Sequence, residues 1–232
     1  MAIWKKKTRV PNIDKNNAIP DLVWRFLSLR VENEIELNKI LNPTLSELKD
    51  PLLILNMDKA VQRLIEAFEQ NEKICIYADF DLDGTSGLAI LNEGLKKIGF
   101  QNVIYYQPKR LAEGYGFHPQ AVEDLQSQGV KLIVTVDVGI TSFAAFKMAQ
   151  KLKVDAILTD HHLPIQEEGV EKLPEAFCIV NPNQKQDKSG LNYLCGAGVA
   201  FYLLRALKRG FFEKESLPKK DWDLKDVLDF FC

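Results

Sequence analysis

The feature that most constrains the fold is a series of short apolar runs that begins at residue 74 and alternates with segments of helical periodicity. Alternation of this kind is typical of an α/β protein with a parallel sheet. We predict a doubly wound sheet of five parallel strands, in which ligands bind beyond the carboxyl ends of the strands. The predicted strands are 74–78, 103–106, 132–136, 156–158 and 178–180, and the predicted helices between them are 85–98, 118–128, 141–152 and 195–209.

The first 70 residues carry a different pattern, without strand-like runs. Helical segments are predicted at about 19–30, 32–41 and 57–69, and Pro43 and Pro51 mark turns between them. We therefore expect an α-helical N-terminal lead-in, residues 1–70, packed on a core domain of residues 71–232.

Composition says little about the partner of this chain. With 46% apolar residues it can bury a sizeable core, and its formal net charge of −2 gives no global signature of nucleic-acid binding. No run of about 18 apolar residues and no signal peptide is present, which indicates a cytoplasmic protein without membrane contact. The four cysteines form no CxxC pair and are expected to be reduced thiols.

Acidic side chains gather where the first predicted strand ends, in the segment DFDLDG at 79–84. If the chain stays extended there, Asp79, Asp81 and Asp83 share one face and offer oxygen ligands to a cation. The alternative is an EF-hand calcium loop, but Gly84 lies at the wrong offset and no Glu occupies the twelfth loop position. The position at a strand end favours a catalytic metal site.

Two further strand ends carry the same kinds of side chain. Asp137 follows the third predicted strand, where alone it could simply cap the next helix. Asp160, His161 and His162 follow the fourth predicted strand. Imidazole and carboxylate ligands together suit manganese, iron or zinc better than magnesium or calcium, and a neighbouring Asp commonly orients a ligand histidine.

In this order and spacing, the motifs resemble those of the DHH phosphoesterase superfamily, and Asp160-His161-His162 matches the signature that names it. Further segments resemble the RecJ branch of that superfamily, whose members are exonucleases of single-stranded DNA. They are Leu41-Asn42-Pro43, Asp50-Pro51, Met57, Arg110 with Glu113-Gly114-Tyr115-Gly116-Phe117, Asn181-Pro182-Asn183, and LCGAGVAF at 194–201.

The resemblance implies metal ligands and catalytic residues. Asp81, Asp83, Asp137 and His161 would hold metal, Asp79 and Asp160 would be ligands or support them, and His162 would contact the scissile phosphate or orient a ligand. The implied cofactor is a pair of Mn²⁺ ions, with Mg²⁺ as the alternative. Two such ions about 3.5–4 Å apart bind the attacking and leaving oxygens of a phosphodiester and lower the pKa of a bridging water.

Six other positions are predicted to bind substrate, besides His162. Arg110 fits a phosphate contact, although a basic loop residue is often merely solvated. Tyr115 could stack on a base or pack as a turn aromatic, and the N–H groups of Gly196 and Gly198 could face a phosphate or allow close helix packing. The full set of predicted substrate-binding residues is Arg110, Gly114, Tyr115, His162, Asn181, Gly196 and Gly198.

The function implied by the resemblance is metal-dependent, 5′-to-3′ hydrolysis of single-stranded DNA in repair and recombination. The implied partners are the DNA strand and a helicase or single-strand-binding protein, and we expect a monomer. The alternatives are a DHH phosphodiesterase of oligoribonucleotides or cyclic dinucleotides, a manganese pyrophosphatase, and a replisome scaffold without catalysis.

Similar proteins continue into a fourth motif, Gly-Thr-x-x-Asp, which supplies a further metal-binding carboxylate. The sequence ends at Cys232, before that motif. We therefore expect a truncated chain that binds metal weakly and cuts poorly or not at all.

Overall fold

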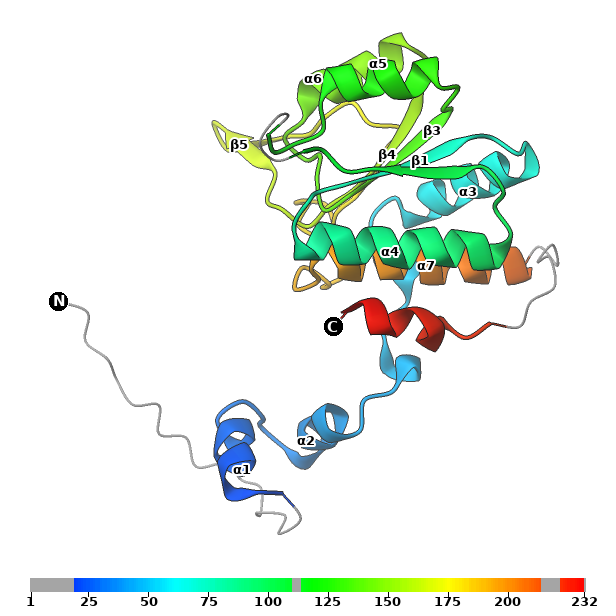
Figure 1. The fold of residues 1–232 in the computed structure, drawn as a ribbon. Helices are drawn as coiled ribbons and strands as arrows, with labels where there is room; N and C mark the ends of the chain where they lie inside the picture. The colour runs from blue at the N-terminus through cyan, green and yellow to red at the C-terminus, as the bar shows by residue number, and fades with distance from the viewer. Residues whose placement is uncertain (1–18, 110–113, 214–221, 232) are drawn as a thin grey trace. The chain divides into compact units, whose positions relative to one another are not determined.

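A five-stranded parallel sheet forms the centre of the computed structural model, which describes residues 19–109, 114–213 and 222–231 (Figure 1). The strands lie in the order β2-β1-β3-β4-β7 and every pairing is parallel. Their bounds are β1 Ile74–Ala78, β2 Val103–Tyr106, β3 Leu132–Val136, β4 Asp155–Thr159 and β7 Cys178–Val180. The predicted fold class is confirmed.

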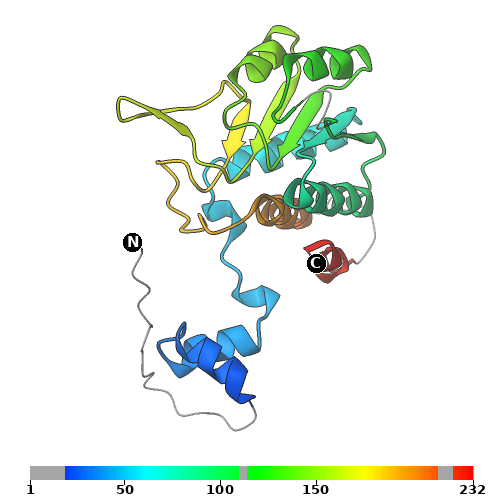
Figure 2. The ribbon, with the colours of Figure 1, turned by 60° about the vertical axis from the view of Figure 1, so that its left-hand side comes forward.

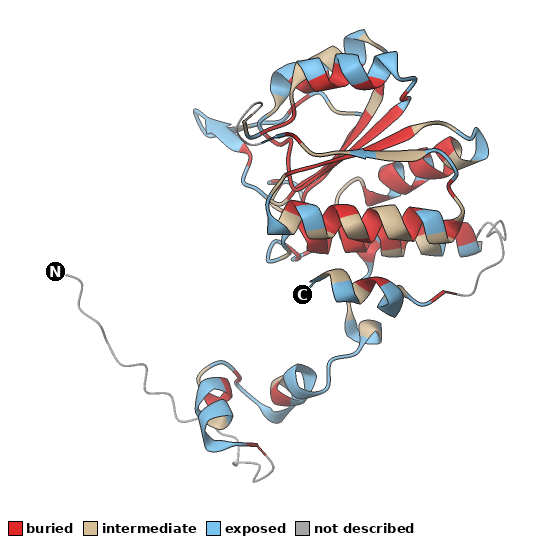
Figure 3. Cartoon of the chain, in the orientation of Figure 1, coloured by how far each residue is buried: buried red, intermediate tan, exposed pale blue. Residues whose placement is uncertain are grey.

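Helices cover both faces of this sheet. In Figure 1, α5 (Pro119–Ser127) and α6 (Phe143–Lys151) lie over one face, and α3 (Met57–Glu69), α4 (Leu82–Ile98) and α7 (Gly196–Glu213) lie over the other. Strands β1 and β3 are buried along their whole length, and the helices turn their exposed residues outward (Figure 3). Continuous burial on both faces explains why these strands are apolar without alternation.

The strand order places a topological switch between β1 and β3. From β1 the chain crosses through α4 to β2 on one side, and it later returns through α5 to β3 on the other side of β1. Ligands of doubly wound sheets bind outside the carboxyl ends of the strands at such a point. The fold therefore directs attention to the residues that follow β1 and β3.

Two glycines allow α4 to lie close to its neighbours. A Cβ at Gly94 would come within 2.3 Å of the Leu204 side chain on α7, and one at Gly87 would come within 2.6 Å of Val136 Cγ1 on β3. Both approaches are closer than van der Waals contact permits. Glycine at these positions thus sets the spacing between α4, α7 and the sheet.

The chain divides into two compact units, Met1–Lys49 and Asp50–Cys232. The described part of the first contains α1 (Asp21–Ser28), α2 (Glu34–Leu41) and the 3-10 turn η1 (Leu45–Glu47), around a small core of Ile19, Leu27, Val31 and Leu37. Helix α3 packs against α7 within the second unit, and the domain boundary at residue 70 stays a prediction. Packing of the lead-in on the core stays a prediction.

Short elements outside the sheet complete the second unit. They are the 3-10 turns η2 (Pro51–Leu53) and η3 (Leu224–Phe231) and an antiparallel hairpin of β5 (Ile165–Glu167) and β6 (Val170–Lys172). Figure 2 shows the hairpin projecting from the sheet. None of the helices in the described ranges combines the length and apolar character that crossing a bilayer requires.

A buried ion-pair cluster ties α3 to the amino end of β4. Arg63 is 6% exposed and donates to Glu72 at 2.6 Å and to Asp155 at 2.7 Å. Burial opposes the charge, but hydrogen bonds to Asp155 and Glu72 raise the pKa of Arg63. The guanidinium therefore stays charged, and its removal leaves two carboxylates without their partner.

We expect Arg63→Ala to lower the free energy of unfolding by about 3 kcal/mol, because breaking a buried ion pair leaves uncompensated charge. The control is Arg209→Ala, whose half-exposed pair with Asp50 contributes less than about 1 kcal/mol. Urea unfolding of both variants measures the difference. Equal losses would contradict the structural role of Arg63.

Candidate metal centre

Strand register brings three aspartates level with one another at the carboxyl edge of the sheet. Ala78 pairs with Val136, and Val136 pairs with Thr159, so the residues that follow these strands are neighbours. Asp79 N donates to Val136 O and Asp137 N donates to Thr159 O, both at 3.1 Å. Asp79 and Asp137 therefore leave the sheet side by side at the switch point.

Asp81 and Asp83 reach the same place by another geometry than the sequence suggested. The condition of an extended chain through residues 79–83 is not met, because α4 begins at Leu82. Asp81 is the N-cap of α4 and accepts a hydrogen bond from Gly84 N at 3.0 Å. A Cβ at Gly84 would lie 2.4 Å from Asp79 O, so glycine is needed for this tight start of the helix.

Asp83 bridges the first turns of α4 and α7. Its carboxylate accepts from Gly196 N at 2.6 Å and from Ala197 N at 2.7 Å, where the first N–H groups of α7 have no partner within the helix. Its Oδ2 also lies 3.6 Å from Nε2 of His161. Asp83 therefore connects the α7 terminus to the histidine pair.

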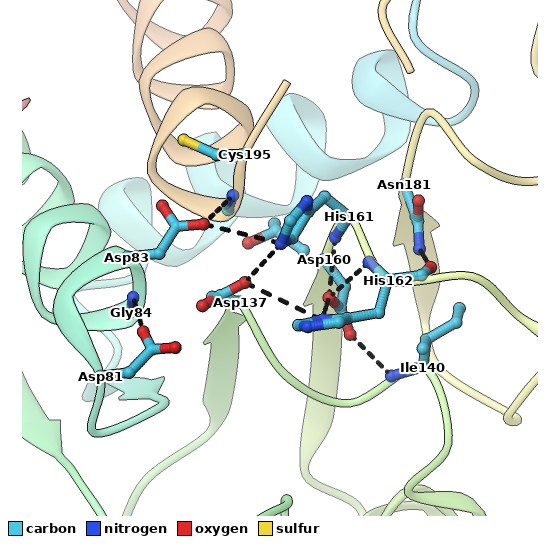
Figure 4. A network of polar contacts seen from close by, with 12 residues as sticks. Asp81, Asp83, Gly84, Asp137, Ile140, Asp160, His161, His162, Asn181 and Cys195 are labelled. Carbon is cyan, nitrogen blue, oxygen red and sulfur yellow. Dashed lines mark hydrogen bonds and ion pairs between the residues drawn. The ribbon is translucent and has the colours of Figure 1, made fainter. Parts of the chain in front are cut away.

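Asp137 occupies the centre of the cluster (Figure 4). Its φ of 60° is left-handed, an uncommon conformation for a residue with a side chain, although Asp tolerates it better than most. The side chain is 1% exposed, and its Oδ1 lies 3.1 Å from His161 Nε2 and 3.9 Å from His162 Nδ1. A Cβ at Gly196 would lie only 2.4 Å from the same oxygen, so Gly196 provides space for Asp137.

Asp160 directs both of its oxygens at protein donors. Oδ1 accepts from the backbone N–H of His161 at 2.7 Å and of His162 at 3.1 Å and contacts His162 Nδ1 at 2.7 Å, and Oδ2 accepts from Ile140 N at 3.0 Å. Burial alone would raise the pKa of Asp160, but the hydrogen bonds from His162 and then from Ile140 lower it. This carboxylate is thus fully engaged in holding the histidine segment.

The bond to Asp160 also governs the charge of His162. It raises the pKa of His162 to about 9, against an opposing effect of burial. The ring therefore carries a proton at neutral pH and presents a cationic group beside Asp137. Tyr115, which is 52% exposed, lies edge-on to this ring with centroids 6.3 Å apart.

Two buried carboxylate oxygens stand apart from this satisfied network. Asp79 Oδ1 and Asp137 Oδ1 are buried and accept no hydrogen bond in the described part of the chain, although Asp137 Oδ1 lies within ion-pair distance of His161 Nε2. Burial raises the pKa of both carboxyls, that of Asp137 to about 8, and the charges of Asp83 and Asp81 add to the shift at Asp137. Unpaired buried oxygens are costly unless a cation binds them.

Two groups of side chains could hold such a cation. The ligand atoms within each group lie within 4.8 Å of one another, and Asp137 belongs to both groups. The groups are Asp79, Asp81 and Asp137, and Asp137, His161 and His162. A set of carboxylate and imidazole ligands around a shared aspartate fits one or two divalent ions.

The predicted substrate-binding residues fall into different environments. Asn181 is fully buried, and its amide donates to His162 O at 2.9 Å instead of facing solvent. The N–H of Gly196 is engaged by Asp83, and that of Gly198 donates to Cys195 Sγ. A Cβ at Gly114, in a left-handed turn, would meet open space. Arg110 lies outside the described residues.

Some contributors to the site were not predicted from the sequence. Gln107 Nε2 donates to Asp79 O at 2.8 Å and to Thr85 Oγ1 at 3.0 Å, which fixes the segment between β1 and α4. Asn183 donates to His161 O, and Ile140 N contacts Asp160. Gln107 follows a strand end and was open to detection by the same rule that found Asp137, whereas the Ile140 contact is made by backbone and leaves no sequence signal.

Known proteins are similar to this chain in both sequence and fold. It is 37% identical over 178 residues to the single-stranded-DNA-specific exonuclease RecJ of Salmonella typhimurium, a match that covers 75% of this chain and 30% of the relative. RecJ of Haemophilus influenzae is 33% identical over 232 residues, which covers 98% of this chain and 38% of the relative. The chain thus spans about a third of the length of these curated relatives.

Solved structures of RecJ exonucleases show the same similarity. A crystal structure of exonuclease RecJ bound to manganese matches with a TM-score of 0.60 at 35% identity, covering 71% of this chain and 39% of the other. RecJ of Thermus thermophilus in complex with Mn²⁺ matches with a TM-score of 0.56 at 30% identity, covering 77% and 23%. The family model for the N-terminal domain of the DHH family matches residues 73–228, more than half of the sequence. The chain belongs to the DHH family.

Proposed function

We propose that this chain is the catalytic region of a metal-dependent nuclease that hydrolyses phosphodiester bonds of single-stranded DNA. The observation that carries the proposal is the pair of buried oxygens, Asp79 Oδ1 and Asp137 Oδ1, which accept no hydrogen bond from the described residues and lie at the switch point of the sheet. The similarity to RecJ exonucleases, two of them with manganese in their structures, supports this assignment.

The residues present suit two divalent ions, Mn²⁺ or Mg²⁺. Asp79, Asp81 and Asp137 would hold one, and Asp137, His161 and Asp83 would hold the other. Bound ions of this kind supply Lewis acidity, which lowers the pKa of water and stabilises charge on phosphoryl oxygens. Asp160 is assigned as the residue that orients the histidines, because both of its oxygens already accept hydrogen bonds.

The chain's own residues prepare the site for a phosphodiester. Asp160 holds His162 in its protonated form, so the ring offers a positive charge and an N–H to a phosphate oxygen. Tyr115 forms an exposed wall beside that ring, where a base can stack. Gly114, next to Tyr115, and Arg110 are proposed to contact the strand as well.

The finer parts of the proposal follow from the family resemblance. They are digestion from the 5′ end, a monomeric enzyme in the cytoplasm, a place in DNA repair and recombination, and cooperation with a helicase or single-strand-binding protein. The competing functions are hydrolysis of short oligoribonucleotides or cyclic dinucleotides and a scaffold role without catalysis. A single nuclease assay distinguishes these two functions from the proposed one.

We expect slow, manganese-dependent release of nucleotides from 5′-phosphorylated single-stranded DNA, because the fourth motif lies outside this sequence, and a loss on the order of 100-fold or more in Asp137→Asn, which removes a shared ligand. Duplex DNA and a dinucleotide are measured alongside. Glu123→Gln on α5 is the control, since this exposed carboxylate lies outside the cluster. Faster cleavage of the dinucleotide would favour the oligoribonuclease, and strand binding without any turnover would favour the scaffold.

Manganese affinity is expected to rise with pH. The carboxyl of Asp137 has a pKa of about 8 in the metal-free protein, and a cation must displace its proton. The dissociation constant for Mn²⁺ should therefore fall by about tenfold for each pH unit between about 6 and 8. Isothermal titration in buffers of different ionisation enthalpy measures both the constant and the released proton. A constant that does not change over this range would contradict the raised pKa.

Asp137→Asn is expected to stabilise the metal-free protein at about pH 8. An aspartate whose folded pKa is raised loses stability as pH rises through that pKa, because the folded state must then hold a buried charge. Asn keeps the shape and tolerates the left-handed backbone without the charge. Urea unfolding should show a gain of about 1–3 kcal/mol at this pH.

The gain should disappear near about pH 3, below the ordinary pKa of an unfolded aspartate, where the wild-type carboxyl is largely neutral in both states. Glu123→Gln should change stability at neither pH. A variant that is less stable than the parent at the higher pH would show that Asp137 stabilises the fold by itself.

A further inference from the structure

The backbone of His161 and His162 leaves the sheet directly after β4 and needs partners for its polar groups. Its two N–H groups donate to Asp160. Its two carbonyls are approached from the opposite side by two asparagine amides. Asn181 Nδ2 donates to His162 O at 2.9 Å, and Asn183 Nδ2 donates to His161 O (Figure 4 shows the first).

We infer that Asn181 and Asn183 are positioning residues for the histidine pair of the metal centre. The inference rests on the proposed metal-dependent function and gives Asn181 a different role from the substrate contact that the sequence suggested. All four backbone polar groups of the His161-His162 dipeptide are held by side chains of Asp160, Asn181 and Asn183. The direction of the two imidazole rings depends on this dipeptide.

The turn after β7 is itself held in place. Asn181 Oδ1 accepts from Asn183 N at 2.8 Å, so the two asparagines form one unit. Gln184, which is 5% exposed, donates from Nε2 to the carbonyls of Ile179 and Asn181, both at 3.1 Å. Asn56 Nδ2 at the start of α3 also donates to Ile179 O. The two asparagines are therefore held in position by hydrogen bonds that involve β7 and the start of α3.

An amide meets the hydrogen-bonding requirement at both positions. Each must donate to a carbonyl, and Asn181 must at the same time accept from an N–H. An aspartate would place an acceptor against a carbonyl oxygen, and an alanine would leave that oxygen unpaired. Without them the histidine backbone would be held only on the Asp160 side.

The test is Asn183→Ala, because Asn183 is only half-buried and its loss leaves no large cavity. The matched control is Asn102→Ala. Asn102 is exposed before β2, at the other end of the sheet, and its Nδ2 donates to Asn71 O in the same kind of bond. We expect the dissociation constant for Mn²⁺ to rise by about tenfold in Asn183→Ala and to stay at the parent value in Asn102→Ala.

A second measurement separates positioning from general loss of structure. In the metal-free protein, the ring ¹⁵N signals of His161 and His162 should shift in Asn183→Ala and stay unchanged in Asn102→Ala. A merely structural role would lower the melting temperature without moving these signals. Parent-like signals and parent-like affinity in folded Asn183→Ala would overturn the inference.

Two further results distinguish failure of the proposed function from failure of the inference about the asparagines. If the parent chain binds no Mn²⁺, the proposed function fails, while the ring signals still decide whether the asparagines position the histidines. If Asn183→Ala does not fold, hydrogen exchange of the Nδ2 protons in the parent decides. Slow exchange at both asparagines supports the inference, and exchange as fast as that of Asn102 overturns it.

Discussion

Electrostatic repulsion among the carboxylates at the carboxyl edge of the sheet is the constraint on which the rest of this structure depends. Asp79, Asp137 and Asp160 are each no more than 3% exposed, so they have lost most of their hydration and lie near like charges. The three carboxylates differ in their hydrogen-bond partners and in the direction of their pKa shifts. Asp160 receives a full set of donors and a lowered pKa, whereas Asp79 and Asp137 keep buried oxygens that accept no hydrogen bond from the described residues and have raised pKa values.

This difference separates positioning from binding. A carboxylate whose lone pairs are all used by N–H groups is fixed and has little left to offer a cation, and its cost of burial is offset by those bonds. A carboxylate with an unpaired buried oxygen is destabilising until a cation arrives. The cost of burying its carboxylate means that Asp137 lowers the stability of the metal-free fold and favours the binding of a cation. Strained or charged functional sites commonly trade stability for activity in this way.

Much of the fold and of the candidate site could be predicted from the sequence, because both follow from buried parallel strands. Strands such as β1 and β3 are buried on both faces and are therefore almost entirely apolar, and β1, β2, β3 and β7 were predicted at their observed bounds. The parallel register then brings the residues after each run to one edge. Asp79, Asp137, Asp160, His161 and His162 meet there for that reason.

What the sequence did not reveal depends on contacts between distant segments. Asp81 caps α4, and the helix turns Asp83 toward the terminus of α7, 113 residues away. The burial of Asn181 and the space that Gly196 leaves for Asp137 likewise arise only in the packed structure. The β5–β6 hairpin was missed because its three-residue strands are exposed and mostly polar, without a buried face to impose a pattern.

The terminus of α7 shows how the site distributes its positive charge. The first N–H groups of a helix and its dipole attract anions, and a glycine-rich start such as Gly196-Ala197-Gly198 suits a phosphate. Here Asp83 occupies these donors, so the helix stabilises a carboxylate of the protein. A phosphate that approaches this edge of the sheet therefore meets a cluster of carboxylates, and the positive N-terminus of α7 is already bound to Asp83. The charge of the phosphate has to be balanced by cations held among the aspartates and by protonated His162, so under the proposed function the bound metal would be needed to hold a phosphodiester as well as to cleave it.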